Sequence, residues 1–470
     1  MEWFSKNKLW LAGTGFFIIS TTLRFLAVNQ TEHPSGWDGY YYVMQVHSWL
    51  TYGYLQSPDF SFIYPYFAAI TIIVDDPIFG FKVGVAIIGG MLVAATFYSL
   101  LKSGADFKWI CVACSYFIFS PLITYFILQF PKNALGMVFL ILFIASLPRK
   151  IPSIIFLIAA IMTHRMTGSF AIFVGLAYAI RVIPWKWILT GLIALAAISL
   201  LPGIIHLSDL LRFEGQFTLM PHWAPFAFAR IFPNTLSILF KSELILISLL
   251  VVVLIIRWRA IYKSPWLVIA LISVFPFFSF GAGDVGHRFF LIAPIAFVML
   301  VPVTGIPYRL TWIIVSVFLV LSWLSWRSYK PRGFDPPNKA YSKVIERLRD
   351  RYEQEEYPLV IAHQSLAEMI IFETDFDALN WLPPKDMPPQ HVVRLIKGLQ
   401  FADFRRYLDS DDMRQVKPMA SRYFATQEDV WQRFVQKVSE EDDRKLMKRI
   451  YSDFNPMSER PYFINKGKIR

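Results

Sequence analysis

Residues 9–28, LWLAGTGFFIISTTLRFLAV, decide the class of fold, because this apolar run is about as long as a helix that spans a bilayer. Lys6 and Lys8 precede the run, whereas residues 29–60 contain no Lys or Arg. Basic residues favour the cytoplasmic side of a membrane. We therefore expect an N-terminus inside and residues 29–60 outside. Because no small-residue cleavage site follows, we interpret the run as a retained span and not as a signal peptide.

The whole chain has the composition of a protein with several membrane spans. Of its 470 residues, 55% are hydrophobic and 17% aromatic, and the mean hydropathy is +0.45. Residues 1–326 hold 20 Lys and Arg against 11 Asp and Glu, whereas residues 327–470 hold 26 against 23. The net charge of +12 thus comes mainly from short clusters between apolar runs. This distribution argues against nucleic acid as a partner.

Apolar runs separated by basic clusters predict about eleven membrane helices, with the tail after residue 326 outside. Residues 64–77, YPYFAAITIIVDDP, hold an apolar run too short to cross, so we expect a half-buried hairpin or an interfacial helix there. The expected spans are residues 9–28, 78–101, 108–129, 132–147, 152–163, 167–180, 187–203, 242–256, 265–281, 289–303 and 310–326.

The predicted fold class is an α-helical polytopic membrane protein with a small soluble C-terminal domain of α/β or α+β type. We expect a transmembrane domain, a Pro-rich charged linker and the soluble domain, at residues 1–326, 327–340 and 341–470. In the last part, YPLVIAHQSLAEMIIFETD predicts a strand, a turn and a helix that begins near Gln364. Helical patterns follow around residues 390–408, 427–438 and 442–451. Both cysteines, Cys111 and Cys114, lie in an apolar segment, which excludes a disulfide framework.

Ionisable residues gather next to the expected spans on the outer side. Such groups are costly near lipid and usually face a water-filled or functional interior. We therefore expect a polar cavity that opens toward the outer leaflet. The residues are Asp38, His47, Asp75, Asp76, Lys132, His164, Arg165, His206, Asp209, Arg212, Glu214, His222, Arg230, Lys241, Asp284, His287 and Arg288.

Asp38, in the stretch SGWDGYYYVMQVHSWL, is the main candidate for catalysis. A carboxylate within hydrogen-bond reach takes a proton from an attacking hydroxyl, or it binds a metal. The alternative is an aspartate that caps the N-terminus of an amphipathic helix. The aromatic neighbours fit either an interfacial helix or a surface on which sugar rings stack; they are Trp37, Tyr40, Tyr41, Tyr42 and Trp49.

Cations at three predicted outer turns suggest an anion site. Lys132 begins a span, where a cation opposes the helix dipole, so we expect it to serve an anion. His164 and Arg165 interrupt an apolar region in THRMTG and together fit a phosphate; snorkelling is the alternative for Arg165. His287 and Arg288 lie where a later span starts, and an Arg beside exposed backbone N–H groups suits a phosphate. The alternative for Arg288 is a headgroup anchor.

Two further motifs have simpler explanations. Asp75 and Asp76 precede Pro77 and fit helix capping as well as a functional role. GAGDVGHRFF matches GxGxxG, but it follows a membrane span and has no βαβ unit around it. We therefore reject a dinucleotide site.

The order of these features resembles the GT-C superfamily of polytopic glycosyltransferases, which use polyprenyl- or dolichyl-phosphate-linked sugars as donors. The likeness covers roughly residues 9–326, and a soluble outer C-terminal domain is also common in that superfamily. It rests on GWDGYYY, YPYFAAITIIVDDP, SPLITYFILQFPKNALGMVFL, IMTHRMTGSFAIFVG and GHRFFLIAPIAFVML.

The resemblance implies that Asp38 is the general base and that Arg288 contacts the donor phosphate. Lys132, Arg165 and His287 are further candidates for the phosphate. We expect the sugar and acceptor cavity to include Trp37, Tyr40, Tyr41, His47, Asp76 and His164. Many relatives carry a second acid after the first-loop acid, or an acid at the turn before the fourth span. Gly39 and Lys132 stand there in this chain, which leaves open whether a divalent metal (Mg or Mn) takes part.

We therefore expect an inverting hexosyl- or pentosyltransferase that acts on an acceptor hydroxyl of a glycan, lipid or protein. Its expected place is the bacterial inner membrane, with a cytoplasmic N-terminus and a periplasmic or extracellular tail, in contact with membrane lipids. A transporter or flippase of lipid-linked anions is an alternative, although no internal repeat is evident. A polysaccharide polymerase or ligase is another, because residues 204–232 hold His206, Arg212, His222 and Arg230. A scaffold that displays the tail does not explain the one-sided polar set.

Overall fold

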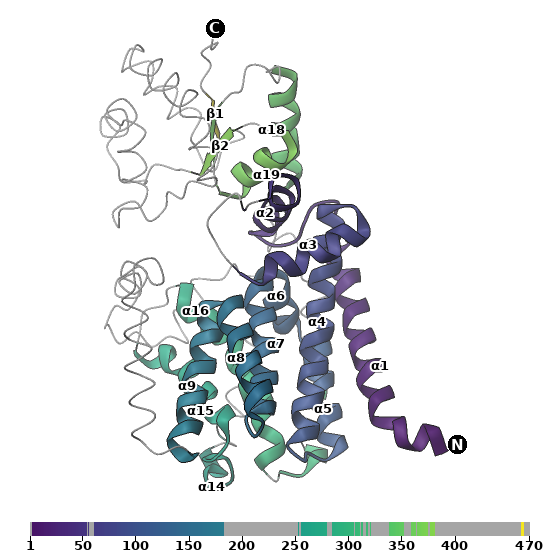
Figure 1. Cartoon of the computed structure of the whole chain (residues 1–470), viewed down its shortest axis with the longest axis vertical. Helices are drawn as coiled ribbons and strands as arrows, with labels where there is room; N and C mark the ends of the chain where they lie inside the picture. The colour runs from purple at the N-terminus through teal and green to yellow at the C-terminus, as the bar shows by residue number, and fades with distance from the viewer. Residues whose placement is uncertain are drawn as a thin grey trace. The chain divides into compact units, whose positions relative to one another are not determined.

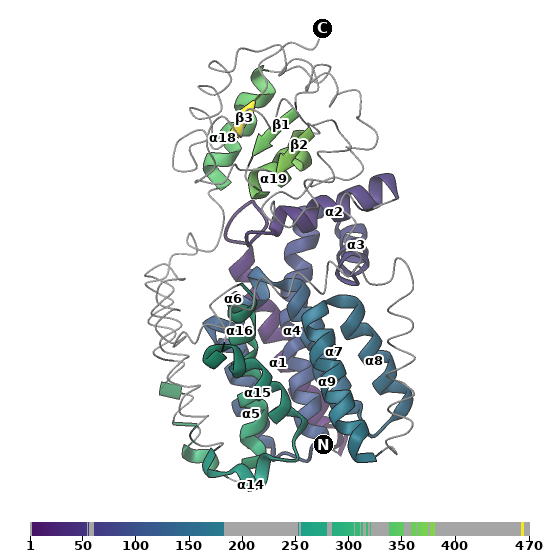
Figure 2. The same cartoon turned by 90° about the vertical axis from the view of Figure 1, so that its left-hand side faces the viewer.

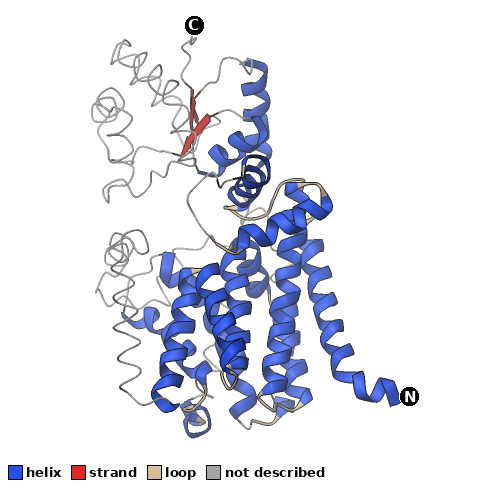
Figure 3. Cartoon of the chain, viewed as in Figure 1, coloured by secondary structure: helices blue, strands red, loops and turns tan. Residues whose placement is uncertain are grey.

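The structure, a computed structural model, describes residues 2–53, 61–182, 255–279, 284–304, 306–310, 338–351, 359–362, 364–374, 377–380 and 462–464, with a few isolated positions between them. These residues are mostly helical, as Figure 3 shows in blue. The chain divides into two compact units. Unit 1 comprises residues 1–30, 61–63 and 83–333, and unit 2 comprises residues 31–60, 64–82 and 334–470.

Two helices are long and apolar enough to cross a membrane, which suggests a membrane protein. They are α1 (Glu2–Val28), from Lys8 onward, and α4 (Pro77–Lys102). Both coincide with predicted spans. A third candidate is the pair α5 (Phe107–Phe119) and α6 (Pro121–Gln129), whose axes are bent by 58° at the break between them. We predicted one helix for this region, and Pro121 is the reason for the break.

The other described residues of unit 1 form mostly shorter helices. Helices α7, α8 and α9 pack against one another, and α15 lies along α16 (Figure 2). Their bounds are α7 (Pro131–Ser146), α8 (Lys150–Thr163), α9 (Arg165–Val182), α14 (Trp258–Ile261), α15 (Pro265–Ser279), α16 (Asp284–Leu300) and the 3-10 turn η1 (Val301–Thr304). The helix that covers most of the predicted span 289–303 begins earlier, at Asp284. The predicted spans 187–203, 242–256 and 310–326 lie outside the described residues, apart from isolated positions.

Small residues bring the helices of unit 1 close together. A Cβ atom at Gly90 of α4 would lie 2.1 Å from the Thr21 hydroxyl of α1, so only glycine fits there. Beside it, the Ser20 hydroxyl donates to the Gly89 carbonyl at 2.9 Å. The outward face of α8 is apolar instead, with Ile151, Ile154 and Ile158 exposed at helical spacing. Such a face suits contact with lipid.

Arg24 of α1 donates hydrogen bonds to backbone carbonyls at the break between α5 and α6. Pro121 has no backbone N–H, so the Phe117 carbonyl loses its helical partner, and the bend removes the partner of the Ile118 carbonyl. The Arg24 guanidinium donates to both, with Nη2 2.6 Å from the Phe117 oxygen and Nη1 bonded to the Ile118 oxygen. Arg24 is only 1% exposed. One side chain thus satisfies the two carbonyls that the bend leaves unpaired.

Unit 2 joins a segment that follows α1 to the C-terminal part of the chain. Helices α2 (Gly39–Tyr52) and α3 (Ile63–Val74) come from the first part, and α18 (Asn338–Arg351) and α19 (Gln364–Thr374) from the second. Strands β1 (Leu359–Ala362), β2 (Asp377–Asn380) and β3 (Tyr462–Ile464) form a sheet in the order β2-β1-β3. β1 pairs in parallel with β2 and antiparallel with β3, so α19 is the crossover of a β1-α19-β2 unit (Figure 1).

The first-loop helix α2 forms part of the hydrophobic core of the C-terminal segment. Tyr341, Ile345 and Leu348 present one face of α18 at i, i+4 and i+7. Tyr40 and Met44 of α2 pack into the same core, together with Leu366, Ala367, Met369, Ile370 and Ile371 of α19. Sequence patterns did not predict this association, because the segments are some 300 residues apart. The boundaries we predicted for the domains and the helices expected after residue 390 remain predictions, since the latter lie outside the described residues.

We predict that Arg24→Met lowers the free energy of unfolding by about 3 kcal/mol, because two buried carbonyls lose their partners. Arg24→Lys is expected to lose less, since the ammonium still donates. Thermal unfolding in detergent measures the effect. Lys102→Met is the control, because Lys102 is exposed at the end of α4. An Arg24→Met protein as stable as the wild type would contradict this role.

Candidate functional site

Asp38 occupies the N-cap position of α2, but its side chain does not cap the helix. Its backbone angles are φ −97° and ψ 12°, and the carboxylate makes no capping hydrogen bond. Two other aspartates do cap. Asp76 accepts from the Phe79 N–H at 2.8 Å at the start of α4, and Asp106 accepts from the Lys108 N–H at 3.2 Å at the start of α5. The capping explanation therefore applies to Asp76 and Asp106 and does not apply to Asp38.

The turn before α2 has a glycine on each side of Asp38, at Gly36 and Gly39. Gly36 has φ +84°, in the left-handed region that favours glycine, and its carbonyl accepts from the Gly39 N–H at 3.2 Å. A Cβ atom at Gly39 would lie 3.1 Å from the Pro34 carbonyl. Gly39, which stands where many GT-C members have a second acid, is thus explained by close packing. This turn leaves Asp38 half-buried at the start of the helix.

The aromatic residues of the first loop divide into packing residues and accessible ones. Tyr40 is 2% exposed in the core of unit 2, and the buried Tyr42 ring stacks on Phe81 with centroids 5.9 Å apart. In contrast, Trp37 is 44% exposed and Tyr41 is half-buried. His47 is also half-buried and lies edge-on to the Phe372 ring at 5.6 Å. Of the predicted sugar-cavity residues in and just before α2, Tyr40 therefore serves packing, whereas Trp37 and Tyr41 are accessible to a ligand.

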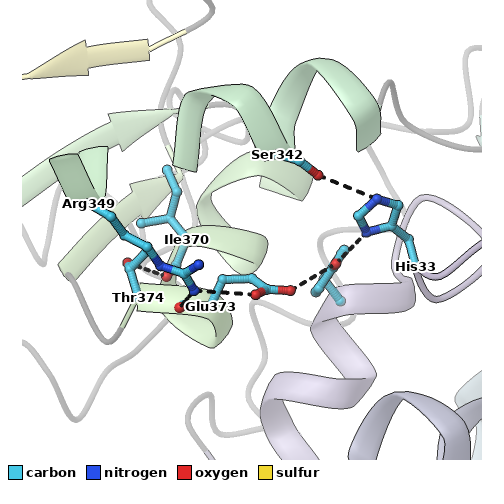
Figure 4. A network of polar contacts seen from close by, with 7 residues as sticks. His33, Ser342, Arg349, Ile370, Glu373 and Thr374 are labelled. Carbon is cyan, nitrogen blue, oxygen red and sulfur yellow. Dashed lines mark hydrogen bonds and ion pairs between the residues drawn. The ribbon is translucent and has the colours of Figure 1, made fainter. Parts of the chain in front are cut away.

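A chain of polar contacts joins the first loop to α18 and α19. His33 Nδ1 lies 2.8 Å from the Tyr40 hydroxyl, which donates to Glu373 Oε1 at 3.3 Å. The other ring nitrogen of His33 lies 3.4 Å from the Ser342 hydroxyl, as Figure 4 shows. Burial lowers the pKa of His33, and burial followed by the charge of Glu373 raises the pKa of Tyr40. We had not singled out His33 or Glu373, because nothing local in the sequence relates residues 340 positions apart.

In unit 1, Lys132 and Arg165 stand at neighbouring helix starts. Helix α7 begins at Pro131 and α9 at Arg165, and α8 runs back between them. A Cβ atom at Gly136 would lie 2.1 Å from the Thr167 hydroxyl, so the first turns of α7 and α9 pack tightly. Lys132 is half-buried and Arg165 is exposed. The structure thus brings together, at one end of unit 1, two cations predicted to contact the donor phosphate.

His164 forms the break between α8 and α9. Its backbone is extended, and its Nδ1 accepts from the Met166 N–H at 3.2 Å, so the ring caps the start of α9. Residues 61–63 join unit 1 here. The Ser61 hydroxyl donates to the Thr163 carbonyl at 2.6 Å, and the Phe62 N–H donates to the Met162 carbonyl at 3.2 Å. This explains why THRMTG interrupts an apolar region: it holds a helix break and its caps.

Asn133, beside Lys132, is a further polar residue that the sequence did not single out as a candidate. It is 2% exposed, and its Oδ1 finds no hydrogen-bond partner in the described part of the chain. An unpaired buried oxygen costs about 1–3 kcal/mol, so such a group calls for an explanation. A hydroxyl of a bound ligand would satisfy it. Only its place next to Lys132 could have drawn attention to it.

The remaining predicted residues are described in part or not at all. His287 and Arg288 lie in the first turns of α16, but their side chains are outside the described residues. Helix α16 runs antiparallel to α15 and ends in η1, which contacts α14, so its start lies at the end of unit 1 away from α14 (Figure 1). The residues of the loop 204–232 and Lys241 are outside the described residues as well. Within the described residues, no three His, Cys, Asp or Glu side chains are placed to share a metal ion.

Comparison with known proteins adds no relative: no family model and no curated protein matches the chain. The chemistry of the site therefore rests on its residues.

We predict that His33 makes the stability of the protein depend on pH. Its pKa is lowered by burial and by Lys82, against the opposing charges of Glu373 and Glu32. The unfolded chain therefore binds the proton more tightly, so this contribution is complete above the usual pKa of 6.5 and is lost as the pH falls below it. His33→Gln should reduce the fall in melting temperature between about pH 7.5 and about pH 5. An unchanged fall would contradict the role of His33.

Proposed function

We propose that the protein is a membrane glycosyltransferase of the GT-C type, which moves a sugar from a polyprenyl-phosphate donor to an acceptor hydroxyl on the extracytoplasmic side. The observation that supports this most directly is Asp38. Its carboxylate makes no capping hydrogen bond to α2, in contrast to Asp76 and Asp106, and it lies beside the exposed Trp37 and the half-buried Tyr41. Accessible aromatic rings can stack on a sugar, and a carboxylate beside them can take the proton of the acceptor hydroxyl.

The proposed topology has about eleven spans and a soluble tail of α/β type, in a bacterial inner membrane. It is supported by the shared core of α2, α18 and α19, because segments that pack together must lie on one side of a membrane. Ten of the eleven proposed spans lie between them, and an even number of spans returns the chain to the same side. The lack of Lys and Arg in residues 29–60 makes this the outer side.

In the proposed reaction Asp38 takes the proton of the acceptor hydroxyl as its oxygen attacks the anomeric carbon of the donor sugar. The bond from that carbon to the phosphate oxygen breaks, and the lipid phosphate leaves with the electron pair. A single displacement of this kind inverts the anomeric centre. Asp38 holds the proton at the end of the step, and the phosphate carries the new negative charge.

The helix starts of α7, α9 and α16 are the proposed site for the donor phosphate. Backbone N–H groups at a helix start attract anions, and cations beside them strengthen the attraction. Lys132, Arg165 and Arg288 are the residues we propose for this role. They would stabilise the charge that develops on the leaving phosphate. Whether a Mg or Mn ion assists stays open.

A transporter or flippase of lipid-linked anions is the second candidate. The same helix starts would then bind the lipid phosphate, but no bond would break. This function needs no base, so the two proposals differ in what they require of Asp38.

We predict that Asp38→Asn lowers the transfer rate about a thousandfold, because a general base contributes on the order of 10²–10⁴. The measurement is sugar transfer by the purified protein from a panel of polyprenyl-phosphate monosaccharides. Asp106→Asn is the control, since Asp106 is also an aspartate at a helix start, but one whose side chain caps. It should retain wild-type turnover.

Full turnover in Asp38→Asn would remove Asp38 from the base role. No turnover with any donor, together with saturable binding of a lipid phosphate that Asp38→Asn leaves unchanged, would favour the transporter.

We also predict that Lys132→Gln and Arg288→Gln each raise the KM for the donor about tenfold, since each removes a charge-assisted contact worth roughly 1.5–3 kcal/mol. Steady-state kinetics at varied donor concentration give the result. Lys102→Gln should leave KM unchanged, because Lys102 ends α4 on the predicted inner side, opposite to the outer turns that carry Lys132 and Arg288. A donor KM unaffected by both changes would exclude these residues from the phosphate site.

A further inference from the structure

We propose that α19 of the C-terminal segment positions Asp38 for catalysis, with Glu373 and Ser365 as the positioning residues. The inference rests on the role proposed above for Asp38. Neither residue is assigned to contact the substrate. They act on Asp38 through the backbone and side chains of its neighbours in α2.

The first contact fixes the backbone just before Asp38. The Ser365 hydroxyl, in the first turn of α19, donates to the Trp37 carbonyl at 3.1 Å. Ser365 is buried, so water does not compete freely for this bond. The peptide that links Trp37 to Asp38 is thereby held by α19.

The second contact fixes the helix just after Asp38. The Tyr40 hydroxyl donates to Glu373 Oε1 at 3.3 Å, and the Tyr40 ring lies 6.0 Å from the Phe372 ring. Tyr40 is two residues after Asp38 and follows it into the first turn of α2. Ser365 and Glu373, at the two ends of α19, thus hold the residues on both sides of Asp38.

Glu373 is itself held in place. Arg349 of α18 forms an ion pair with Glu373 Oε2 at 3.5 Å and also donates to the Glu373 carbonyl (Figure 4). The side chain therefore has one carboxylate oxygen directed to Arg349 and the other to Tyr40. On the far side of Tyr40, His33 contacts the same hydroxyl at 2.8 Å. The Tyr40 ring has little freedom to turn, and α2 has little freedom to shift along α19.

This arrangement matters for the reaction more than for the fold. The apolar core of Tyr40, Met44, Leu366 and Ile370 keeps α2 and α19 together without the polar contacts. The hydrogen bonds fix the orientation of the residues next to Asp38, which apolar packing alone does not fix. A displacement of about 1 Å in a catalytic group lowers a rate by up to about a hundredfold. Loss of the two contacts is therefore expected to reduce kcat while the protein stays folded.

The test compares Tyr40→Phe, Glu373→Ala and Ser365→Ala in the full-length protein. We expect kcat for sugar transfer to fall about tenfold or more in each, with the donor KM within about twofold of the wild type. Glu373→Gln should recover most of the rate, because its amide oxygen still accepts from Tyr40. The double variant Tyr40→Phe with Glu373→Ala should be no slower than the slower single variant, because both remove one contact.

Tyr341→Phe is the matched control. Tyr341 belongs to the same hydrophobic core and is buried, and its hydroxyl has no hydrogen bond among the described residues. The same substitution there should leave kcat unchanged. Hydrogen exchange of the peptide covering residues 35–45 gives a readout without turnover: it should quicken in Tyr40→Phe and Glu373→Ala, and stay as in the wild type in Tyr341→Phe and Glu373→Gln.

The outcomes separate this inference from the proposed function. Wild-type kcat in all three variants, with Asp38→Asn inactive, would overturn the positioning role and leave the glycosyltransferase proposal standing. An equal loss in Tyr341→Phe would also overturn it, since the effect would then be general to the core. Full activity of Asp38→Asn would overturn the proposed role of Asp38, and the positioning role would fall with it. Should Tyr40→Phe fail to fold, Ser365→Ala and the pair Glu373→Ala and Glu373→Gln decide the question.

Discussion

The helical part of the chain depends on the contact of one buried cation with two backbone carbonyls. Arg24 reaches from the first apolar helix to the break between α5 and α6, and it donates to the carbonyls of Phe117 and Ile118. Without it, the bend would leave these two groups unpaired in apolar surroundings, at a cost of about 1–3 kcal/mol each. The bend sets the direction of α6, and α6 leads directly into Pro131, where α7 begins with Lys132. The position of the candidate binding residue Lys132 therefore depends on the structural contacts of Arg24.

The C-terminal segment has a comparable dependence, on a helix that is not its own. Its core is completed by Tyr40 and Met44 of α2, which lies near the other end of the sequence. The same helix begins at the candidate base Asp38. The geometry of the candidate site in unit 2 is thus set jointly by a short loop and by the tail. Neither can be interpreted by itself, and the tail has a structural role whatever else it does.

Local patterns predicted the local features, and they could not predict how these features combine. Apolar runs located α1 and α4, and the YPLVIAHQSLAEMIIFETD pattern located β1 and α19, because helix and strand periodicity is a property of neighbouring residues. Residues 108–129 form one apolar run, so hydropathy predicts a single span there and does not resolve the break at Pro121. Sequence could not separate Asp38 from Asp76, since an aspartate before a helix looks the same whether or not it caps. The contact of Tyr40 with Glu373 joins residues 333 positions apart, which no periodic pattern encodes.

The position of α2 in the chain also sets an order of assembly. Because a ribosome makes the chain from its N-terminus, α2 is complete long before α18 and α19 exist, and Tyr40 and Met44 lack their partners in those two helices in the meantime. Contacts of such long sequence separation form slowly. The surroundings of Asp38 are therefore finished only after most of the protein has been synthesised. An incomplete chain that stops before residue 338 would carry the aspartate but none of the residues of α18 and α19 that surround its helix.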